Sequence, residues 1–503
     1  MIASRPLKSM IILLAIAISS FTYGQAGSIG EYVTASSCPF ELPDGLVLGQ
    51  NFSYGHINVP VFHKQPTGAY IRLDVAIFPC SDPENKKEPM VMNTSGPGKS
   101  NMDNFIPQIA SGLGSYLLPG RDIVIIELRG LRYSSTFLNC EEVFQANIDM
   151  LDENLSYDES MTRLSEALKK ARIRFENDNI ELSAYNNTET AKDIHMVMDA
   201  LGYSKFNIVG SSAGTLIAQN VIRENPERVR CAILDAGLPV EKTLLCNYVG
   251  FIVERLKIYF SECQQDSVCN QSFPYLEERF LDLVESLNNK PLEISTKDPV
   301  SGEERTALIN GYRLSEHVFM NMFYTTQIPL LISNILNGDY SSLEQFANGK
   351  YISNHFADGL GHTIFLSETG DCEAKDIQID PAYRLFADGI TLSGLGWNFL
   401  CEVKKQWGID SSNLFRATEK ETLDTPILVL NGKYDPVIPV QFDKILKKQF
   451  INSYIYRFDG VAHSAFDNAT SCVLPMFLDF LNNPNQAPQS DCIKLFKQEY
   501  QVK

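Results

Sequence analysis

A serine set between two glycines, Gly210-x-Ser212-x-Gly214, has the spacing of an activated nucleophile. An apolar run typical of a buried strand ends at Gly210, and a helix-forming run begins at Ala213. Glycines at the flanking positions permit a sharp strand-to-helix turn, because a side chain there would strike the neighbouring element. The backbone N–H of Ala213 points at the same space and can stabilise an oxyanion. The pattern predicts Ser212 as the nucleophile, with Ser211 in the wrong register; a turn without chemistry is the alternative.

A serine hydroxyl is a poor nucleophile until a base takes its proton, and that base needs an acid to orient it. Asp435 follows an apolar run at 426–430 and precedes a proline-containing loop. His463 lies on a loop after a second apolar run, at 453–458. The chain order nucleophile, acid, histidine and these strand-end positions predict that Ser212, Asp435 and His463 form a catalytic triad. Asp235, which also ends an apolar run, is the alternative acid.

A second backbone N–H for an oxyanion is expected near Ser95-Gly96-Pro97-Gly98, which follows a short apolar run at 90–94. Small residues let the main chain approach a reacting carbonyl closely. We assign this N–H to Ser95 or Gly96. An ordinary Pro-Gly turn is the alternative.

Alternating strand and helix patterns predict an α/β fold with a mostly parallel sheet that positions these residues. Strands are predicted at 57–62 and 71–78, which form an antiparallel hairpin, and at 90–94, 123–128, 206–210, 232–235, 426–430 and 453–458. Residues 141–182 and 188–201 read as helices. Residues 241–424 read as amphipathic helices without strand alternation. We therefore predict a core in two parts, 27–240 and 425–503, separated by a helical cap at 241–424.

The N-terminus has the pattern of a secretory signal peptide over residues 1–26. Arg5 and Lys8 precede a short apolar stretch, which is followed by small residues. Secretion or periplasmic residence is therefore expected, without stable membrane association. The net charge of −18 gives no support to nucleic acid as a partner.

The chain has 11 cysteines, and an oxidising compartment would let most of them pair. Cys263 and Cys269 are close in sequence, and Cys472 and Cys492 bracket the last predicted helix, so each is a candidate disulfide pair. Cys231 lies in an apolar run and is the expected free thiol. No C-x-x-C motif occurs, so no metal site or cofactor is predicted.

Taken together, these motifs resemble those of α/β-hydrolase serine peptidases of the proline iminopeptidase and tripeptidyl aminopeptidase family. The resemblance spans most of the chain after the signal and is strongest in the core. Ser95–Gly98 is similar to the family's G-G-P-G loop. Glu127–Ser134 is similar to the D-x-R-G-x-G-x-S motif at the end of a strand, and Tyr185–Asp193 is similar to the Y-x-T-x-x-A-x-D motif at the start of a helix. The elbow, Asp435, His463 and both cysteine pairs also fall at family positions. Ser95 replaces a glycine, Glu127 replaces an aspartate, and Leu131-Arg132 alters the glycine spacing.

The resemblance implies a secreted serine exopeptidase that releases short N-terminal units, with no cofactor, from peptides with a free N-terminus. Such an enzyme needs an anion in the cap to pair with the substrate's α-amine, and Glu368, Asp371 and Glu373 are the candidates, although solvated surface acids are the alternative. A carboxylesterase with the same triad is the second hypothesis. A non-catalytic binding protein is the third.

Overall fold

The computed structural model describes residues 28–64, 68–93, 96–240, 245–297, 302–350, 355–369, 379–409 and 422–502. The predicted signal peptide lies outside these ranges. The described strands form one sheet of nine strands in the order β1-β2-β3-β5-β4-β6-β7-β10-β11 and a separate two-stranded sheet, β8-β9. The bounds are β1 Tyr32–Thr34, β2 Ser53–Pro60, β3 Tyr70–Phe78, β4 Met90–Asn93, β5 Ile123–Ile126, β6 Phe206–Ser211, β7 Val229–Asp235, β8 Leu292–Lys297, β9 Glu304–Ile309, β10 Ile427–Gly432 and β11 Ser453–Phe458.

The large sheet is antiparallel at one edge and parallel through its centre. The pairs β1/β2, β2/β3 and β3/β5 are antiparallel, and β5/β4, β4/β6, β6/β7, β7/β10 and β10/β11 are parallel. The central strands are buried along their length, as in β4 and β5, which explains their unbroken apolar sequences. The predicted hairpin and parallel strands are thereby confirmed, and the short β1 is an additional edge strand.

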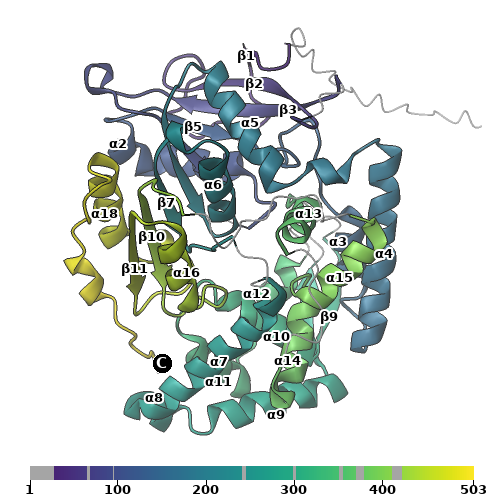
Figure 1. Ribbon diagram of the computed structural model, residues 1–503. Coiled ribbons are helices and arrows are strands. Elements are labelled where there is room, and N and C mark those ends of the chain that lie inside the picture. The colour runs from purple at the N-terminus through teal and green to yellow at the C-terminus, as the bar shows by residue number, and fades with distance from the viewer. Residues whose placement is uncertain are drawn as a thin grey trace, which may run out of the picture.

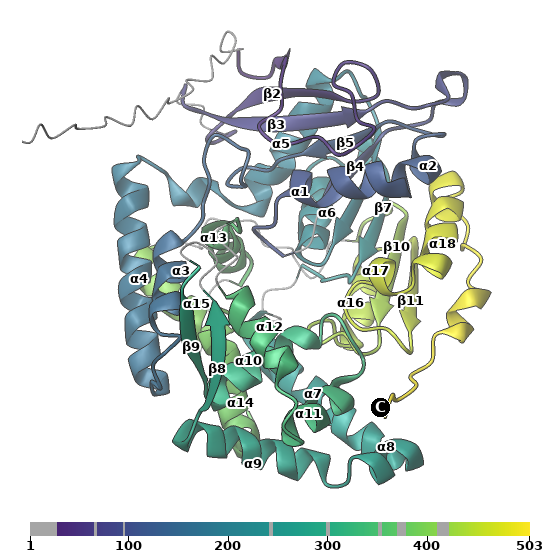
Figure 2. The ribbon, with the colours of Figure 1, turned by 180° about the vertical axis from the view of Figure 1, so that it is seen from behind.

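Helices cover both faces of this sheet. Helices α5, α6 and α16 lie on the face toward the viewer in Figure 1, and α1, α2 and α18 lie on the face toward the viewer in Figure 2. The helix bounds are α1 Asn101–Gln108, α2 Gly114–Leu117, α3 Glu141–Asp149, α4 Tyr157–Asn177, α5 Asn187–Ala200, α6 Ala213–Glu224, α7 Tyr248–Gln265, α8 Ser267–Ser272, α9 Leu276–Asn289, α10 Gly311–Asn321, α11 Ile328–Leu336, α12 Ser341–Gly349, α13 Asp358–Thr369, α14 Arg384–Leu392, α15 Trp397–Trp407, α16 Gln441–Gln449, α17 Ala465–Asn468 and α18 Thr470–Asn482.

The segment between β7 and β10 contains helices α7 to α15, as its amphipathic pattern predicts, but it also contains strands. The antiparallel hairpin β8/β9 corrects the expectation that this segment lacks strand alternation. In β8 the residues Ile294 and Thr296 are buried and their neighbours are exposed, the period of two that marks a half-buried strand. Leu308 of β9 donates its backbone N–H to the carbonyl of Leu151, so the hairpin packs beside the end of α3.

A fully buried ion pair joins two of the sequence motifs that resemble the peptidase family. The Arg129 guanidinium donates to both carboxylate oxygens of Asp193 at 2.6 and 2.7 Å, and both side chains have 0% exposure. Arg129 also donates to the carbonyls of Val61 and Ala184, and His63 contacts the same carboxylate at 2.8 Å. Arg129 therefore ties the end of β5 to α5 and to the segment after β2, which gives these motif residues a structural role.

Removing one member of this pair is expected to destabilise the fold strongly. Arg129→Met leaves the Asp193 carboxylate buried without its main partner, which costs about 3–5 kcal/mol of unfolding free energy. Chemical denaturation of the variant measures this loss. The double variant Arg129→Met/Asp193→Leu is expected to lose less than the single one. Arg172→Met, which breaks the half-exposed pair with Glu176, is the control and should cost under about 1 kcal/mol. Equal losses in Arg129→Met and Arg172→Met would contradict this account.

Both predicted disulfides are present. Cys263 bonds Cys269 and Cys472 bonds Cys492, with Cα–Cα distances of 5.1 and 5.6 Å. Cys246 is disulfide-bonded as well. Cys231 is a free, buried thiol as expected. Four other described cysteines are also free, namely Cys38, Cys80, Cys140 and Cys401, so five of the ten described cysteines are bonded and five are free. Cys80 follows β3, Cys140 precedes α3 and Cys231 lies in β7, and all three are buried as small, weakly polar side chains.

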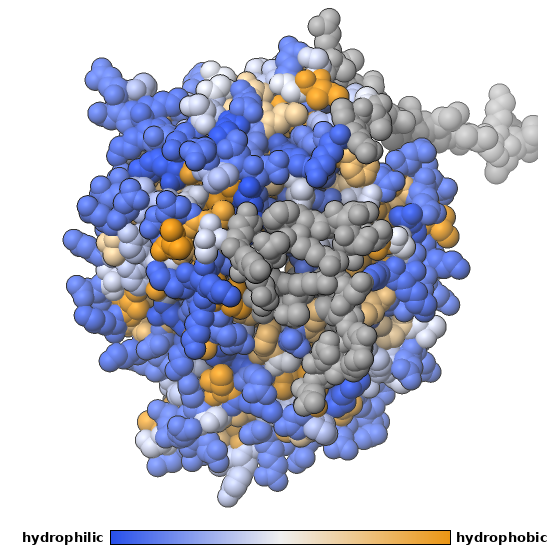
Figure 3. All heavy atoms as spheres, in the orientation of Figure 1, coloured by the Kyte–Doolittle hydropathy of each residue, from blue (hydrophilic) through white to orange (hydrophobic). Residues whose placement is uncertain are grey.

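The face of the molecule in Figure 3 is mainly hydrophilic, with apolar residues in small separate groups. This agrees with the acidic composition, which keeps such a surface well solvated. Within the described ranges, no helix has the length and apolar character that a bilayer span requires.

Candidate active site

Ser212 occupies a strained turn between β6 and α6. Its backbone has φ 51° and ψ −119°, a conformation that non-glycine residues rarely adopt. The Ser212 N–H donates to the carbonyl of Asp235 at 2.8 Å, which fixes the turn against β7. Gly210 is required sterically, because a Cβ there would lie 2.4 Å from the carbonyl oxygen of Gly214. These features are those of a nucleophile elbow, as the glycine spacing predicts.

The structure brings Asp435 and His463 together from the ends of β10 and β11. His463 Nδ1 lies 2.7 Å from Asp435 Oδ2. The other carboxylate oxygen of Asp435 accepts the backbone N–H groups of Val437 and Ile438, at 2.9 and 3.0 Å. Asp435 is 1% exposed, so its carboxylate is held by these contacts rather than by water. A carboxylate at Nδ1 leaves Nε2 of the neutral imidazole free to accept a proton.

Asp235, the alternative acid, binds the backbone next to the histidine instead of the imidazole. Its carboxylate accepts the Ser464 hydroxyl at 2.6 Å and the Ala465 N–H at 2.8 Å. Burial raises its pKa to about 6, against the opposing hydrogen bond from Ser464. Asp235 therefore links the elbow, through its carbonyl, to the loop that carries His463. Sequence position alone did not separate this role from that of Asp435.

The described part of the Ser95–Gly98 loop packs against the segment before α13. Gly96 has φ +65° and Gly98 has φ +126°, and a Cβ on Gly98 would lie 2.6 Å from the carbonyl oxygen of Ala357. The Ala357 N–H donates to the Gly98 carbonyl at 2.9 Å. Ser95 lies outside the described residues. Gly96 follows β4, which pairs with β6, so the loop begins beside the elbow.

Glu127 anchors the start of α1, the helix that follows Gly96–Gly98. The sequence motif that contains Glu127 does not by itself predict this role. Its carboxylate accepts the N–H groups of Met102, in the first turn of α1, and of Tyr133, at 3.2 and 3.3 Å. Burial raises its pKa to about 7, and a hydrogen bond from Ser100 opposes this shift. The glutamate that replaces the family's aspartate thus fixes the start of α1 on β5.

Residues of the 241–424 segment contact the histidine and its acid directly. The His463 N–H donates to the carbonyl of Phe323 at 3.2 Å, and the two rings meet edge to face with centroids 4.9 Å apart. Arg255 of α7 donates to the backbone carbonyl of Asp435 at 3.1 Å. The segment therefore packs on the candidate base as well as on the Gly96–Gly98 loop.

Of the three acids predicted to bind an amine, Glu368 is described, whereas Asp371 and Glu373 lie outside the described residues. Glu368 is on α13, and its carboxylate accepts the side-chain amide of Asn187 at 2.7 Å. Burial raises its pKa to about 7, and Asn187, Arg223 and Asn220 oppose the shift. Glu368 is therefore half-buried against α5 and α6 rather than fully solvated.

Two family models match this chain, and each extends a short way into the 241–424 segment, one from its start and the other from its end. One, described as alpha/beta hydrolase fold, matches residues 88–253, which contain β4 to β7 and the elbow. The other, described as TAP-like protein, matches residues 398–492, which contain Asp435 and His463. The chain belongs to the α/β-hydrolase family. Within it, the two models and the relatives below support the serine peptidases, as the motifs predict.

The curated relatives are proteases. The chain is 26% identical over 261 residues to serine protease Hip1 of Mycobacterium tuberculosis and of Mycobacterium bovis, a match of 48% of this chain and 47% of each relative. The chain thus aligns with about half the length of the curated relatives it matches.

Solved structures similar to this α/β-hydrolase include enzymes of several kinds. An esterase from Exiguobacterium antarcticum is 13% identical, with a TM-score of 0.37 over 82% of this chain and 97% of that one. A meta-cleavage product hydrolase from Pseudomonas fluorescens is 12% identical, with a TM-score of 0.38 over 82% and 94%.

The candidate base gives a predicted pH dependence. Burial of the His463 imidazole lowers its pKa, but the charge and hydrogen bond of Asp435, together with the charges of Asp235 and Asp467, outweigh this effect, and the net pKa lies above 6.5. A protonated imidazole cannot accept the serine proton, so kcat/KM is expected to fall on acidification with a midpoint above 6.5. A pH–rate profile measures the midpoint. Asp467→Asn removes a further nearby negative charge and should move it to lower pH. A rate that is flat between about pH 5 and 8 would exclude His463 as the base.

Proposed function

We propose that this α/β-hydrolase is a serine exopeptidase that releases short N-terminal units, aminoacyl, prolyl or tripeptidyl, through an acyl-enzyme on Ser212. The Ser212 hydroxyl attacks the scissile carbonyl while His463 Nε2 takes its proton. Asp435 holds His463 through Nδ1 and stabilises the imidazolium. His463 then gives the proton to the leaving amine, and water repeats the sequence to release the acyl group. The oxyanion is held by the N–H groups of Ala213 and of Gly96 or Ser95.

The observation that carries this proposal is the Asp435–His463 hydrogen bond beside the strained Ser212 elbow. Both Ser212 and the residues after His463 bind Asp235, through its carbonyl and its carboxylate respectively. The nucleophile and the base are therefore attached to one buried residue. This arrangement supports covalent catalysis more than a binding role, because a binding protein needs neither the strained serine nor a carboxylate-oriented imidazole.

The preference for a chain terminus is inferred from the segment that covers the site. Phe323, Phe356 and Ala357 of residues 241–424 contact the histidine or the Gly96–Gly98 loop, which favours short or terminal substrates over folded chains. A buried α-ammonium costs several kcal/mol unless it is paired with an anion or carbonyls. Glu368, half-buried and hydrogen-bonded by Asn187, is the described candidate for this role, with Asp371 and Glu373 as the other two.

A substrate panel tests the exopeptidase assignment. Aminoacyl and tripeptidyl amides with a free N-terminus are expected to be cleaved, and their N-acetylated counterparts are expected to be cleaved much more slowly. Small neutral esters serve as a reference for the triad itself. If acetylated and free peptides react equally, the exopeptidase assignment fails. If only esters react, the carboxylesterase takes its place.

The amine-binding role has its own variant. Glu368→Gln is expected to raise KM for free-amine peptides about 10-fold or more, since a charge-assisted contact of about 1.5–3 kcal/mol is lost, and to leave ester turnover unchanged. Glu402→Gln, which changes a partly buried glutamate of α15, is the matched control.

Labelling of the wild-type protein by a fluorophosphonate tests whether Ser212 is a reactive nucleophile. If Ser212 remained unlabelled, the non-catalytic binding protein would be favoured.

Export of the chain is part of this proposal. The basic and apolar N-terminal pattern and the two disulfides Cys263–Cys269 and Cys472–Cys492 support a secreted or periplasmic location. The proposed partner is a peptide substrate, with no nucleic acid. Fractionation of the producing cells, with N-terminal sequencing of the exported protein, would test both the location and the predicted cleavage near residue 26.

A further inference from the structure

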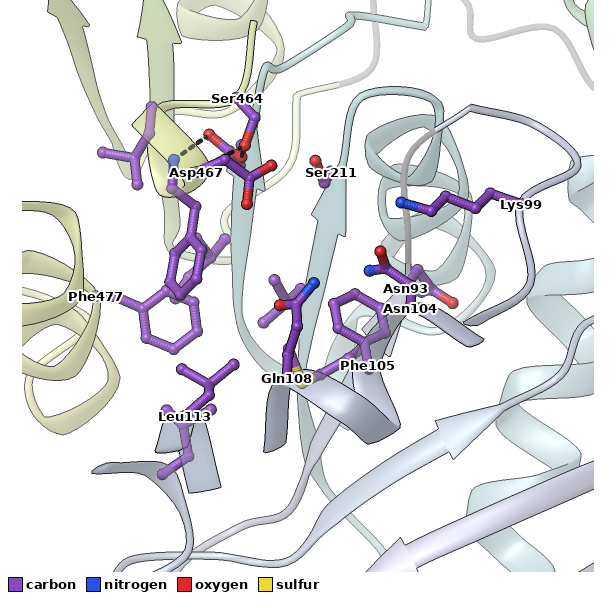
Figure 4. A pocket seen from close by; sticks show the side chains of 17 residues that line it. Asn93, Lys99, Asn104, Phe105, Gln108, Leu113, Ser211, Ser464, Asp467 and Phe477 are labelled. Carbon is purple, nitrogen blue, oxygen red and sulfur yellow. Dashed lines mark hydrogen bonds between the residues drawn. The ribbon is translucent and has the colours of Figure 1, made fainter. Parts of the chain in front are cut away.

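A cavity adjoins the elbow on the side of the sheet that carries α1 and α18. It lies at the carboxyl ends of β4, β6 and β7, and both Ser211 and Ser464 line it. Figure 4 shows Asn93, Lys99 and Asn104 on one side of this cavity and Ser464, Asp467 and Phe477 on the other. Ser211 precedes Ser212 and Ser464 follows His463, so the cavity neighbours the proposed nucleophile and base without being lined by them.

Asn93 lines this cavity, and no hydrogen bond within the protein accounts for its buried side-chain amide. It is the last residue of β4, it pairs with Gly210 of the elbow strand, and it has 0% exposure. Neither its side-chain nitrogen nor its side-chain oxygen has a hydrogen-bond partner. Burying such an amide unpaired costs about 1–3 kcal/mol.

Other buried asparagines of the same sheet show how such a side chain is normally satisfied. The Asn207 amide donates to the carbonyls of Glu88 and Pro89. Asn431 accepts the Gly237 N–H and donates to Asp443. Among the asparagines and glutamines that the structure describes, only Asn93 has both its side-chain nitrogen and its side-chain oxygen buried without a hydrogen-bond partner. A ligand that supplies both partners would remove this cost.

The chemistry of the lining indicates what that ligand is. A free carboxamide offers one acceptor and an N–H donor, which complements a peptide group with its own N–H and C=O. Asn104 and Gln108 on α1 add two more carboxamides to the wall. The rest of the lining is largely apolar and includes Phe105 beside these carboxamides and Phe477 across the cavity from them, with Leu113 at its lower end. The lining has one cation, Lys99, and two anions, Asp467 and Asp235, and the Asp235 carboxylate is already held by Ser464 and Ala465.

We propose that this cavity is a substrate subsite that holds the apolar side chain of a residue flanking the scissile bond, while Asn93 hydrogen-bonds the peptide group of that residue. This assignment rests on the proposed peptidase function and adds a specificity to it. Aromatic and leucine-sized residues fit the apolar part of the lining. Asn93, which pairs with Gly210 of the elbow strand, is placed to bind the substrate backbone close to the reacting carbonyl.

Asn93→Leu separates substrate binding from a structural role. Leucine has nearly the same shape as asparagine but no hydrogen-bond donor or acceptor. If Asn93 had no role in substrate binding, the Asn93→Leu variant would keep the wild-type peptide kinetics and gain stability. We expect kcat/KM for peptides with a flanking Phe or Leu to fall about 10-fold or more, with the melting temperature unchanged or raised and small-ester turnover unchanged. Gln449→Leu, which removes another incompletely paired buried amide on α16, is the control and should leave peptide kinetics unaltered.

A filling variant tests the apolar part and identifies which side of the scissile bond is bound. Leu113→Trp is assayed with two peptide series, one that varies the residue on the acyl side and one that varies the residue on the leaving side from Ala to Phe. The preference for Phe over Ala is expected to fall about 10-fold or more in one series, which names the bound residue. The subsite would be overturned if Leu113→Trp left the preference for Phe over Ala unchanged in both series. It would also be overturned if the wild-type protein cleaved peptides and Asn93→Leu cleaved them with the same kcat/KM. A wild-type protein that cleaves no peptide would instead overturn the proposed function.

Discussion

Ser212→Ala is expected to lower kcat by about 10⁶-fold while the protein keeps its fold. The hydroxyl is the atom that forms the acyl-enzyme, so its removal leaves only oxyanion stabilisation and substrate binding. Alanine replaces a small, 8% exposed serine at the same backbone conformation, and the Ser212 N–H contact to Asp235 is a backbone contact that the variant retains. Turnover of the best peptide or ester substrate and a melting curve measure the two parts of this prediction.

Ser211→Ala is the matched control. Ser211 is one residue away on β6, and its side chain lines the neighbouring cavity. Most activity should survive in this variant. A dead Ser211→Ala together with a live Ser212→Ala would show that the register of the elbow has been misassigned.

Asp435→Asn is expected to lower kcat by roughly 10⁴-fold with little loss of stability. An asparagine amide next to His463 Nδ1 favours the tautomer with the proton on Nε2, which cannot accept a proton from the serine. The variant also loses the negative charge that stabilises the imidazolium. Single-turnover kinetics with an active ester would locate the loss in acylation.

Asp235→Asn provides the comparison, because Asp235 is the other buried carboxylate near the histidine. The Asp235 carboxylate accepts hydrogen bonds from Ser464 and Ala465. Because these bonds are charge-assisted, Asp235→Asn should lower the free energy of unfolding by about 1.5–3 kcal/mol. The variant should reduce kcat much less than Asp435→Asn does. The reverse ranking of the two variants in kcat would make Asp235 the catalytic acid.

Local sequence determined the features that depend on neighbouring residues. The Gly210-x-Ser212-x-Gly214 spacing specifies the elbow because its steric conflict, Gly210 against the Gly214 carbonyl, lies within five residues of chain. Continuous apolar runs specify β4, β5 and β10 because parallel central strands are buried on both faces. The sequence does not predict the short β8/β9 hairpin, since six-residue strands beside long helices leave a weak periodic signal.

Only the tertiary structure decided which distant groups meet. Asp235 ends β7 and Asp435 lies shortly after β10, and both follow apolar runs of similar pattern. The strand order β6-β7-β10-β11 places Asp235 against Ser464 and Ala465, and Asp435 against the imidazole. The same holds for Arg129 and Asp193, whose motifs were visible but whose ion pair was not. A side chain's partner depends on packing between elements far apart in the chain, and sequence periodicity reports only whether a residue is buried, not what it faces.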